Sequence, residues 1–282
     1  MYSRINLKIM RSIREVILAL FLLICTLTYA GKLETVTTHS AAMNKDIKAM
    51  VITPDAYDTS KEYPVVYLLH GHSGNYTEWP KRAPQLLELA DTYQMIFVSP
   101  DGNYNSWYFD SEVKPESQYE TYVAEELVAF IDNTYSTIKD RSGRAISGLS
   151  MGGHGALYLA FKHQDVFGAA GSMSGGVDIT PFPNNWEISE YLGAYAAHQD
   201  RWEANSVINM TPLLTPNALQ LMISCGTADF FYDANVKLHE KLEYMNIPHR
   251  FLTTPGGHTW DVWRDAIKYH LVFFDSFFNP VE

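Results

Sequence analysis

The chain alternates between two hydrophobic patterns: short continuous apolar runs and longer segments with helical spacing. Two β-prone runs at 33–40 and 47–53 flank a polar turn at 43–46, which predicts an antiparallel pair. Later strand-length runs occupy residues 63–69, 95–99, 167–173, 218–224 and 250–253 and the segment leading into Ser150. The run 63–69 is typical of a strand buried on both faces, and 95–99 and 221–225 are also predicted to be buried. Helical spacing is found at 84–93, 119–135, 156–161, 234–245 and 260–274. Strands separated by helices predict an α/β fold with a mainly parallel central sheet.

Two helical regions carry further information. In 119–135, Tyr122, Leu127 and Ile131 fall on one face while Glu120 and Glu125 take the other, which predicts an amphipathic helix covering the sheet. Residues 181–216 break the alternation and contain several large aromatic side chains. They are compatible with a cap over a site and equally with a helical excursion at the edge of the sheet.

The first thirty residues differ in kind from the rest. Four basic residues precede an apolar run at 16–27, and small residues follow at 28–30. This order predicts a secretory signal peptide over 1–30, cleaved near Ala30, with residues 31–282 as one catalytic domain. A dozen apolar residues are too few for the roughly 20 that span a bilayer. We therefore expect export to the periplasm or the medium, without stable membrane insertion after cleavage.

The net charge of the chain indicates which classes of macromolecule it can bind. The net charge of the whole chain is −11, and because residues 1–30 carry four basic and one acidic side chain, residues 31–282 carry −14. Such an acidic protein repels phosphate backbones, so nucleic acid is not an expected partner.

Cys25 leaves with the predicted signal, and Cys225 then has no disulfide partner in its own chain. Its apolar surroundings predict a buried thiol.

The most informative motif is Gly148-Leu149-Ser150-Met151-Gly152, placed between a predicted strand and a predicted helix. This context is typical of a nucleophile elbow, in which small residues allow a tight turn that exposes the serine hydroxyl. The N-terminus of the following helix favours negative charge, as an acyl-transfer oxyanion requires. The five-residue pattern by itself also occurs in ordinary glycine-rich turns.

A base and an acid follow in the required places. Asp229 comes after the strand 218–224, and His258 comes after the strand 250–253. The order Ser150, Asp229, His258 is that of an α/β-hydrolase triad. Asp233 is the alternative acid, and Asp178 is a weaker one because it follows an earlier strand.

The remaining histidines have less specific settings. His70 and His72 lack a convincing third ligand, so no metal site is expected there. His154 follows Ser150 on the same helix, where its direction does not suit a base. Four others fall on predicted helices or helix ends and are interpreted as surface or packing residues: His163, His239, His249 and His270.

An oxyanion hole needs two N–H donors, usually from the residue after the nucleophile and from an early βα loop. The backbone N–H of Met151 fits the first position, and that of His72, in the loop after the strand 63–69, fits the second. Three aromatic residues are candidates for the substrate pocket, with core packing as the alternative: Tyr104, Trp107 and Trp186.

The combined motifs resemble the putative-esterase family of α/β-hydrolases, which includes S-formylglutathione hydrolases, tributyrin esterases, feruloyl esterases and mycolyltransferases. The resemblance covers nearly all of 34–282, and its carriers are Tyr67-Leu68-Leu69-His70-Gly71, Pro100-Asp101-Gly102, Gly148-Leu149-Ser150-Met151-Gly152-Gly153, Cys225-Gly226-Thr227-Ala228-Asp229 and Gly256-Gly257-His258. It implies an α/β-hydrolase fold, no cofactor, and the same triad and oxyanion hole as the residues themselves suggest.

The preferred function is that of an exported serine carboxylesterase. Its expected substrates are short acyl or feruloyl esters on plant-type polysaccharides or their oligosaccharides, because an exported acidic enzyme meets extracellular polymers. A tributyrin-type short-chain esterase and an S-formylglutathione hydrolase-like thioesterase are the alternatives within the family. A carbohydrate-binding protein on an inactive hydrolase scaffold is the alternative outside enzymes.

Overall fold

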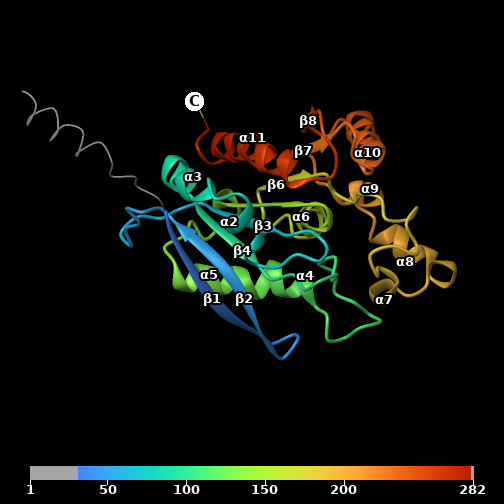
Figure 1. Ribbon diagram of the computed structural model, residues 1–282, viewed down its shortest axis with the longest axis horizontal. Coiled ribbons are helices and arrows are strands. Elements are labelled where there is room, and N and C mark those ends of the chain that lie inside the picture. The colour runs from blue at the N-terminus through green and yellow to red at the C-terminus, as the bar shows by residue number, and fades with distance from the viewer. Residues whose placement is uncertain (1–30, 281–282) are drawn as a thin grey trace, which may run out of the picture. The chain divides into compact units, whose positions relative to one another are not determined.

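The computed structural model describes residues 31–280. The predicted signal peptide therefore lies outside the described residues, and residues 31–282 form a compact unit of their own. An eight-stranded sheet runs through this unit in the order β1-β2-β4-β3-β5-β6-β7-β8 (Figure 1). The strands are β1 (Lys32–Ser40), β2 (Lys45–Thr53), β3 (Val65–Leu69), β4 (Ile96–Pro100), β5 (Arg144–Leu149), β6 (Ala169–Met173), β7 (Gln220–Gly226) and β8 (Arg250–Thr254).

The sheet is mostly parallel, as predicted. β1 and β2 form the expected antiparallel pair, and β2 also pairs antiparallel with β4. From β4 through β3, β5, β6 and β7 to β8 every pairing is parallel. The carboxyl ends of these parallel strands meet along one edge, where α/β proteins form their sites.

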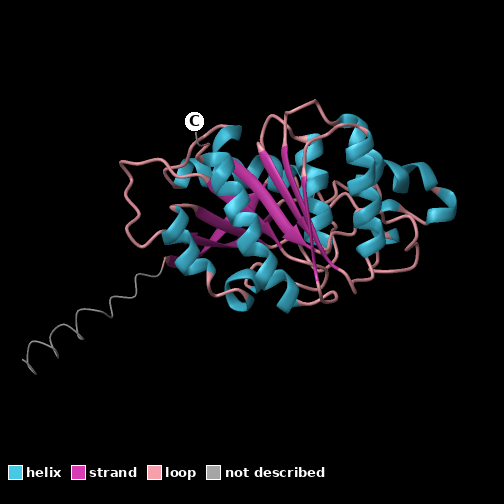
Figure 2. Cartoon of the chain, turned by 90° about the horizontal axis from the view of Figure 1, so that it is seen from above, coloured by secondary structure: helices cyan, strands magenta, loops and turns pink. Residues whose placement is uncertain are grey.

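Helices cover both faces of the sheet (Figures 1 and 2). Those with an α-helical ladder are α2 (Glu78–Arg82), α3 (Leu86–Tyr93), α4 (Tyr119–Thr121), α5 (Val128–Thr134), α6 (Met151–Lys162), α7 (Ser189–Leu192), α8 (Gln199–Ala204), α9 (Val207–Met210), α10 (Tyr232–Tyr244) and α11 (Trp260–Phe278). A π-helical stretch, η1 (Tyr122–Leu127), and three short 3₁₀ turns, η2 (Arg141–Gly143), η3 (Tyr195–Ala197) and η4 (Thr211–Leu213), complete the set.

The two faces have separate cores because side chains alternate along each strand. In β3, Tyr67 and Leu69 belong to the same core as residues of η1, α6 and α10, whereas Val66 and Leu68 belong to the core that contains residues of α2, α3 and α11. All five residues of β3 are buried. Fully burying one such aliphatic side chain contributes about 1.5–3 kcal/mol, so a strand buried on both faces anchors the loop that follows it.

The predicted helix 119–135 differs from the structure in two respects. It contains the π-helical stretch η1, which gives the chain one extra residue per turn there. Glu120, expected on the solvent face, is buried and accepts hydrogen bonds from Tyr158, Lys162 and His163. Burial alone would raise the pKa of this carboxyl, but these three donors outweigh it and lower the pKa to about 2.

The region 181–216 folds as short helices, α7 to α9, beside the end of the sheet (Figure 1). Most of its large side chains are structural, since Tyr191 and Trp202 are fully buried and Tyr195 packs edge-on against Trp202. We call this region the insert. Within residues 31–280, no helix is both long and apolar enough to cross a bilayer.

Candidate active site

Ser150 occupies the sharp turn between β5 and α6 that the motif predicts. Its backbone has φ +55° and ψ −119°, a left-handed conformation that a serine adopts only under constraint. A Cβ at Gly148 would collide with the carbonyl of Gly152, and one at Gly152 would collide with the carbonyl of Leu69. The Ser150 N–H donates to the Met173 carbonyl of β6 at 3.0 Å, which ties the turn to the sheet.

Ser150, His258 and Asp229 come together although they are far apart in the chain. The Ser150 Oγ lies 2.8 Å from His258 Nε2. His258 Nδ1 lies 2.8 Å from Asp229 Oδ2 and 3.0 Å from Oδ1. The Asp229 side chain is 0 % exposed and that of His258 is 16 % exposed. Both partners reach the site because β7 and β8 end beside β5 and β6 at the same edge of the sheet.

The orientation of Asp229 has its own support. Its Oδ1 accepts the Phe231 N–H at 2.8 Å, which fixes the carboxylate against His258. Asp233, the alternative acid, is exposed in the first turn of α10 and is not hydrogen-bonded to His258. Asp178 instead accepts the backbone N–H of Thr180 at 3.1 Å. The geometry therefore favours Asp229 over both alternatives.

The loop after β3 lies against Ser150. A Cβ at Gly71 would be 3.3 Å from the Ser150 Cβ, so the backbone of Gly71 lies directly beside Ser150. Met151 is the first residue of α6, where backbone N–H groups have no partner within the helix. No hydrogen bond within the described residues takes the N–H of His72 or of Met151. Both predicted oxyanion donors are thus available beside Ser150.

We call residues 71–74 the oxyanion loop. Its Ser73 N–H donates to the Tyr104 carbonyl at 2.7 Å. The ring of Tyr104 packs edge-on against that of His72, with centroids 4.8 Å apart, and His72 Nε2 lies 2.7 Å from Glu187 Oε2 of the insert. The loop is therefore fixed on its outer side by contacts from two other segments.

His70 holds the same loop from within. Its Nδ1–H donates to the Gly71 carbonyl at 2.7 Å, and its Nε2 accepts the Gly102 N–H at 2.8 Å. Burial lowers the pKa of His70, which keeps the ring neutral. Since the His72 ring is directed to Glu187, the two imidazoles do not share a ligand position. Within residues 31–280 no cluster of three metal-ligating side chains is present.

Two other histidines pack inside the protein. His154 Nε2–H donates to the Asn205 carbonyl at 2.8 Å, and burial lowers the pKa of its ring to about 4. His270 of α11 lies between the hydroxyls of Ser147 and Ser224, and burial lowers its pKa to about 3. Neither ring contacts Ser150. Of the other histidines predicted to be packing or surface residues, His163 contacts Glu120. His239 and His249 contact each other.

A cavity of about 330 Å³ opens at the triad. Its lining residues are Gly71, His72, Ser73, Glu78, Arg82, Leu149, Ser150, Trp186, Phe230, His258, Trp260 and Trp263. Trp186 and Phe230 stack with centroids 5.8 Å apart, and the Phe230 ring lies 4.3 Å from that of His258. An apolar aromatic wall therefore stands next to the base.

Of the three predicted pocket aromatics, Trp186 lines this cavity. Trp107 is buried behind it, with ring centroids 6.1 Å apart, and donates its indole N–H to the Trp186 carbonyl at 3.3 Å. Tyr104 lies on the outer side of the oxyanion loop. The pocket interpretation thus needs correction for Trp107, which belongs to the core, and for Tyr104, which supports His72.

Sequence reasoning missed the other aromatic and charged lining residues. Phe230 directly follows Asp229, and Trp260 and Trp263 lie within one and a half turns after His258. Their closeness in the sequence to Asp229 and His258 could have identified them as lining residues. The sequence gave no such indication for Glu78 and Arg82, because the short helix α2 that carries them was not predicted.

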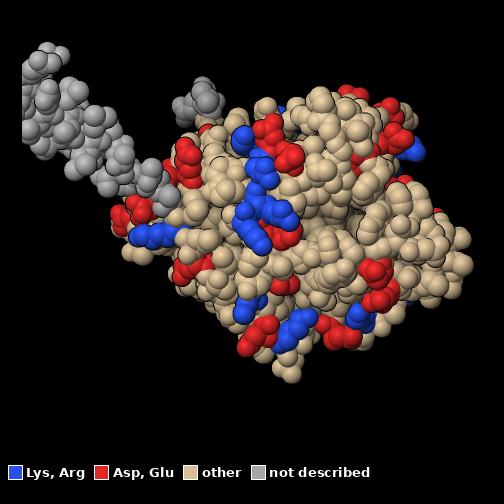
Figure 3. All heavy atoms as spheres, viewed as in Figure 1, with Lys and Arg blue, Asp and Glu red and all other residues tan. Residues whose placement is uncertain are grey.

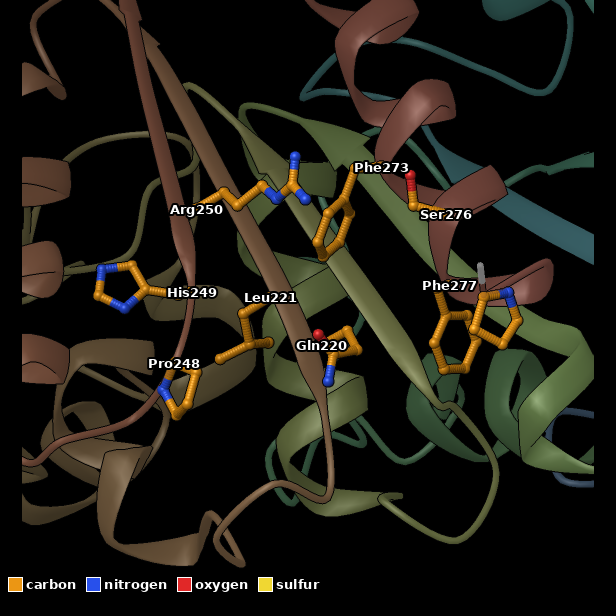
Figure 4. Close-up of a pocket in the computed structure, with 9 residues that line it drawn as sticks. Gln220, Leu221, Pro248, His249, Arg250, Phe273, Ser276 and Phe277 are labelled. Carbon is orange, nitrogen blue, oxygen red and sulfur yellow. The ribbon is translucent and has the colours of Figure 1, made fainter. Parts of the chain in front are cut away.

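A second cavity, of about 460 Å³, lies elsewhere (Figure 4). Gln220 and Arg250, at the starts of β7 and β8, line it together with Phe273 and Phe277 of α11. Strand starts are at the opposite edge of a parallel sheet from the triad. This cavity is therefore separate from the site at Ser150.

On the face shown in Figure 3, acidic and basic side chains are interspersed, with a group of basic residues near the centre.

Comparisons with known proteins agree with this geometry. An acetyl esterase of Caldicellulosiruptor saccharolyticus is 29 % identical over 222 residues, which cover 74 % of this chain and 82 % of the relative. An endo-1,4-beta-xylanase/feruloyl esterase of Xylanibacter ruminicola is 31 % identical over 158 residues, covering 52 % of this chain but 22 % of that longer protein.

Solved structures give the same result for the fold. A ferulic acid esterase superposes with a TM-score of 0.77 at 28 % identity, covering 89 % of this chain and 100 % of its own. The model of the family described as Putative esterase matches residues 40–274, nearly the whole of the α/β unit. With an α/β-hydrolase sheet, a serine elbow and these relatives, the chain belongs to the Putative esterase family and is a hydrolase of ester bonds.

Proposed function

We propose that Ser150, His258 and Asp229 cleave the ester through an acyl-serine intermediate. The single observation that carries this is the continuous chain of short contacts from Ser150 Oγ through His258 to the enclosed Asp229 carboxylate. His258 Nε2 takes the proton as Oγ attacks the carbonyl carbon. Asp229 holds Nδ1–H and stabilises the imidazolium that results.

The negative charge that develops on the carbonyl oxygen is received by the N–H groups of His72 and Met151. Collapse of the tetrahedral intermediate breaks the bond to the alcohol oxygen, and the proton on His258 Nε2 goes to the leaving alcohol. Water then attacks the acyl carbon while His258 Nε2 takes its proton. The bond to Ser150 Oγ breaks, the proton passes from His258 to Oγ, and the acid is released. Apart from water, each step uses only these side chains and backbone donors.

For the substrate we propose short acyl or feruloyl esters carried on plant-type polysaccharides or oligosaccharides. The aromatic wall of Trp186 and Phe230 beside His258 supports a planar acyl group, since offset-stacked aromatic rings attract one another. The cavity volume of about 330 Å³ lies at the lower end of the usual range of roughly 300–1,000 Å³, which favours a small acyl group. The names of the acetyl and feruloyl esterase relatives point the same way.

The test compares kcat/KM for methyl ferulate, acetylated xylo-oligosaccharides, tributyrin and S-formylglutathione, because this ratio reports differential stabilisation of the transition state. We expect a preference for the feruloyl or the acetylated sugar ester. Preference for the thioester would replace the proposal by an S-formylglutathione hydrolase, and activity confined to tributyrin would leave a short-chain esterase. Failure to turn over any ester would support a binding protein on an inactive scaffold.

We also propose that the enzyme is exported after removal of residues 1–30. The basic residues, apolar run and small residues at that end of the sequence support it. Intact-mass measurement of protein recovered from the periplasm or medium is expected to place the N-terminus near Gly31. Recovery of the full chain with Met1 in a membrane fraction would contradict it.

A further inference from the structure

Three aromatic rings surround the imidazole of His258. The centroid of the Phe230 ring lies 4.3 Å from that of His258 with an interplanar angle of 35°, so these two rings are nearer to stacked than to edge-on. Phe231 and Trp263 meet the imidazole edge-on, at 5.5 Å and 4.8 Å. The two edge-on rings limit rotation of the imidazole, and Phe230 covers one of its faces.

Phe230 differs from the other two rings in its exposure. It is 55 % exposed, whereas Phe231 and Trp263 are buried. It is nevertheless held in place, because it directly follows Asp229 and its ring packs against Phe231 at 4.6 Å and against Trp186 at 5.8 Å. The ring that covers the imidazole therefore has a defined position while one side of it stays open to the solvent.

The charge on His258 changes during the reaction. The base is neutral when it accepts the proton of Ser150 and is an imidazolium afterwards. The face of an aromatic ring carries partial negative charge and attracts a cation that lies within about 6 Å of its centroid. The separation of 4.3 Å between Phe230 and His258 is well inside that range. The attraction is therefore stronger in the transition state than in the resting enzyme, which is the condition for a contact to raise the rate.

We propose that Phe230 stabilises the positive charge that develops on His258, in addition to its place in the wall of the cavity. Asp229 stabilises the same charge in the plane of the ring, through Nδ1, whereas Phe230 does so from the face. Phe230 acts through His258 and is a positioning residue in that sense. The inference rests on the proposed function, because it takes His258 as the base for Ser150.

The contact between Phe230 and His258 serves both halves of the reaction. His258 carries the positive charge when the alcohol leaves and again when water attacks the acyl-serine. Weakening the contact should therefore slow turnover whichever half limits the rate. The effect should also be independent of the acyl group, since it does not involve contact between Phe230 and the substrate.

Ring fluorination tests the charge of the face without removing the ring. Fluorine atoms withdraw electron density from the face and so weaken its attraction for a cation, while the shape of the side chain changes little. The variants carry mono-, di- or trifluorophenylalanine in place of Phe230. The substrate is methyl acetate, which has no ring that could stack on the altered side chain. We expect log kcat to fall in proportion to the number of fluorine atoms, by about two- to fivefold in kcat for the trifluoro variant, while KM changes less.

Phe182 is the matched control. Its ring packs against Trp186 at 5.1 Å and against Phe231 at 5.4 Å, both of which Phe230 also contacts. Within residues 31–280 the Phe182 ring makes no aromatic contact with His258. The same fluorinated side chains in place of Phe182 should leave kcat close to wild type.

Two ordinary substitutions supplement the fluorine series. Phe230→Tyr keeps the aromatic face at an exposed position and should retain most of the rate. Phe230→Leu keeps an apolar side chain without a face and should lose at least as much kcat as the trifluoro variant. Wild-type turnover by Phe230→Leu would contradict the proposal even if the fluorinated proteins could not be prepared in folded form.

A kcat that does not depend on the number of fluorine atoms at Phe230, or that depends on it equally at Phe182, would overturn the proposal. His258→Ala separates this inference from the proposed function. Substantial turnover of methyl acetate by that variant would remove His258 as the base and the mechanism with it. An inactive His258→Ala together with a flat fluorine series would disprove only the role of Phe230.

Discussion

Ser150 has a backbone conformation that costs free energy in any residue with a Cβ. Strain of this kind costs of order 1–3 kcal/mol. A glycine at this position would relieve the strain, but its greater freedom in the unfolded chain would offset about 0.4–1 kcal/mol of the gain in stability. With φ at +55° and ψ at −119°, we expect Ser150→Gly to be more stable than Ser150→Ala by about 1 kcal/mol. Urea unfolding of the two variants measures the difference. Equal stabilities would show that the turn is not strained.

Both variants also remove the proposed nucleophile. We expect each to lose several powers of ten in kcat on p-nitrophenyl acetate. Near-native turnover by either one would transfer the nucleophilic role away from Ser150.

The burial of Glu78 predicts a loss of stability when its carboxyl group is charged. A carboxyl group whose pKa is raised in the folded state adds stability below its unfolded pKa and loses it as the pH rises through the folded pKa. Removing the charge with Glu78→Gln should therefore raise the Tm at pH 8 and have a smaller effect at pH 4. Thermal unfolding at the two pH values checks this sign, with Glu88→Gln as the control because Glu88 is an exposed glutamate of the neighbouring helix α3. A lower Tm for Glu78→Gln at pH 8 would mean that the carboxylate is well paired.

At the scale of elements, the contact between His72 and Glu187 ties the oxyanion loop to the insert. His72 Nε2 and Glu187 Oε2 are 2.7 Å apart, and Glu187 is 46 % exposed. Exposed pairs contribute at most about 1 kcal/mol, so Glu187→Ala should lower kcat by about two- to fivefold while KM changes less. Glu187→Gln keeps an oxygen acceptor and should retain most of the rate.

Glu190 provides the matched control for this prediction. It also belongs to the insert and forms an exposed pair, with Lys114 Nζ at 3.1 Å, but it does not contact the oxyanion loop. Glu190→Ala should leave kcat close to wild type. Equal losses in Glu187→Ala and Glu190→Ala would indicate a general effect of the insert rather than support of His72.

Elements with a strong hydrophobic pattern were predictable from the sequence, and so were the residues at their ends. β5 and β7 are buried runs, and β8 is the partly exposed strand at the edge of the sheet. Because parallel strands end at one edge, the chain order of Ser150, Asp229 and His258 was enough to bring them together. The position of Trp107 was not predictable in the same way. A loop residue can face a cavity or the core, and that choice depends on the insert packed over it.

The π-helical stretch η1 and the short helix α2 were also beyond the sequence pattern. One extra residue in a helical turn does not change the apolar spacing enough to be recognised, and a five-residue helix has little spacing to read. Glu78 and Arg82, the charged residues that line the cavity, were not predicted because they lie on α2.

For the whole molecule, buried neutral histidines predict sensitivity to acid. Burial lowers the pKa of His70, of His154 to about 4 and of His270 to about 3. Groups with a depressed folded pKa contribute stability above their unfolded pKa of about 6.5, and this stability is lost as the pH falls. The two protons that His154 and His270 take up on unfolding lower the free energy of unfolding by roughly 3 kcal/mol per pH unit between about pH 6 and pH 4.5, and His70 acts in the same direction.

Urea unfolding across this pH range measures the slope. A free energy of unfolding that stays flat between pH 6 and pH 4.5 would show that these rings are protonated in the folded protein. The acidic surface does not remove the effect, because interactions among exposed charges are largely screened at physiological ionic strength.

The crowding of tryptophan at the cavity has an optical consequence. The chain contains six tryptophans, and Trp186, Trp260 and Trp263 line the space in front of Ser150. A feruloyl group absorbs near-ultraviolet light in the band where indole rings emit, so an ester seated among these rings quenches their fluorescence by energy transfer. In the Ser150→Ala protein, where the ester is not consumed, the decrease in emission during a titration gives its dissociation constant directly.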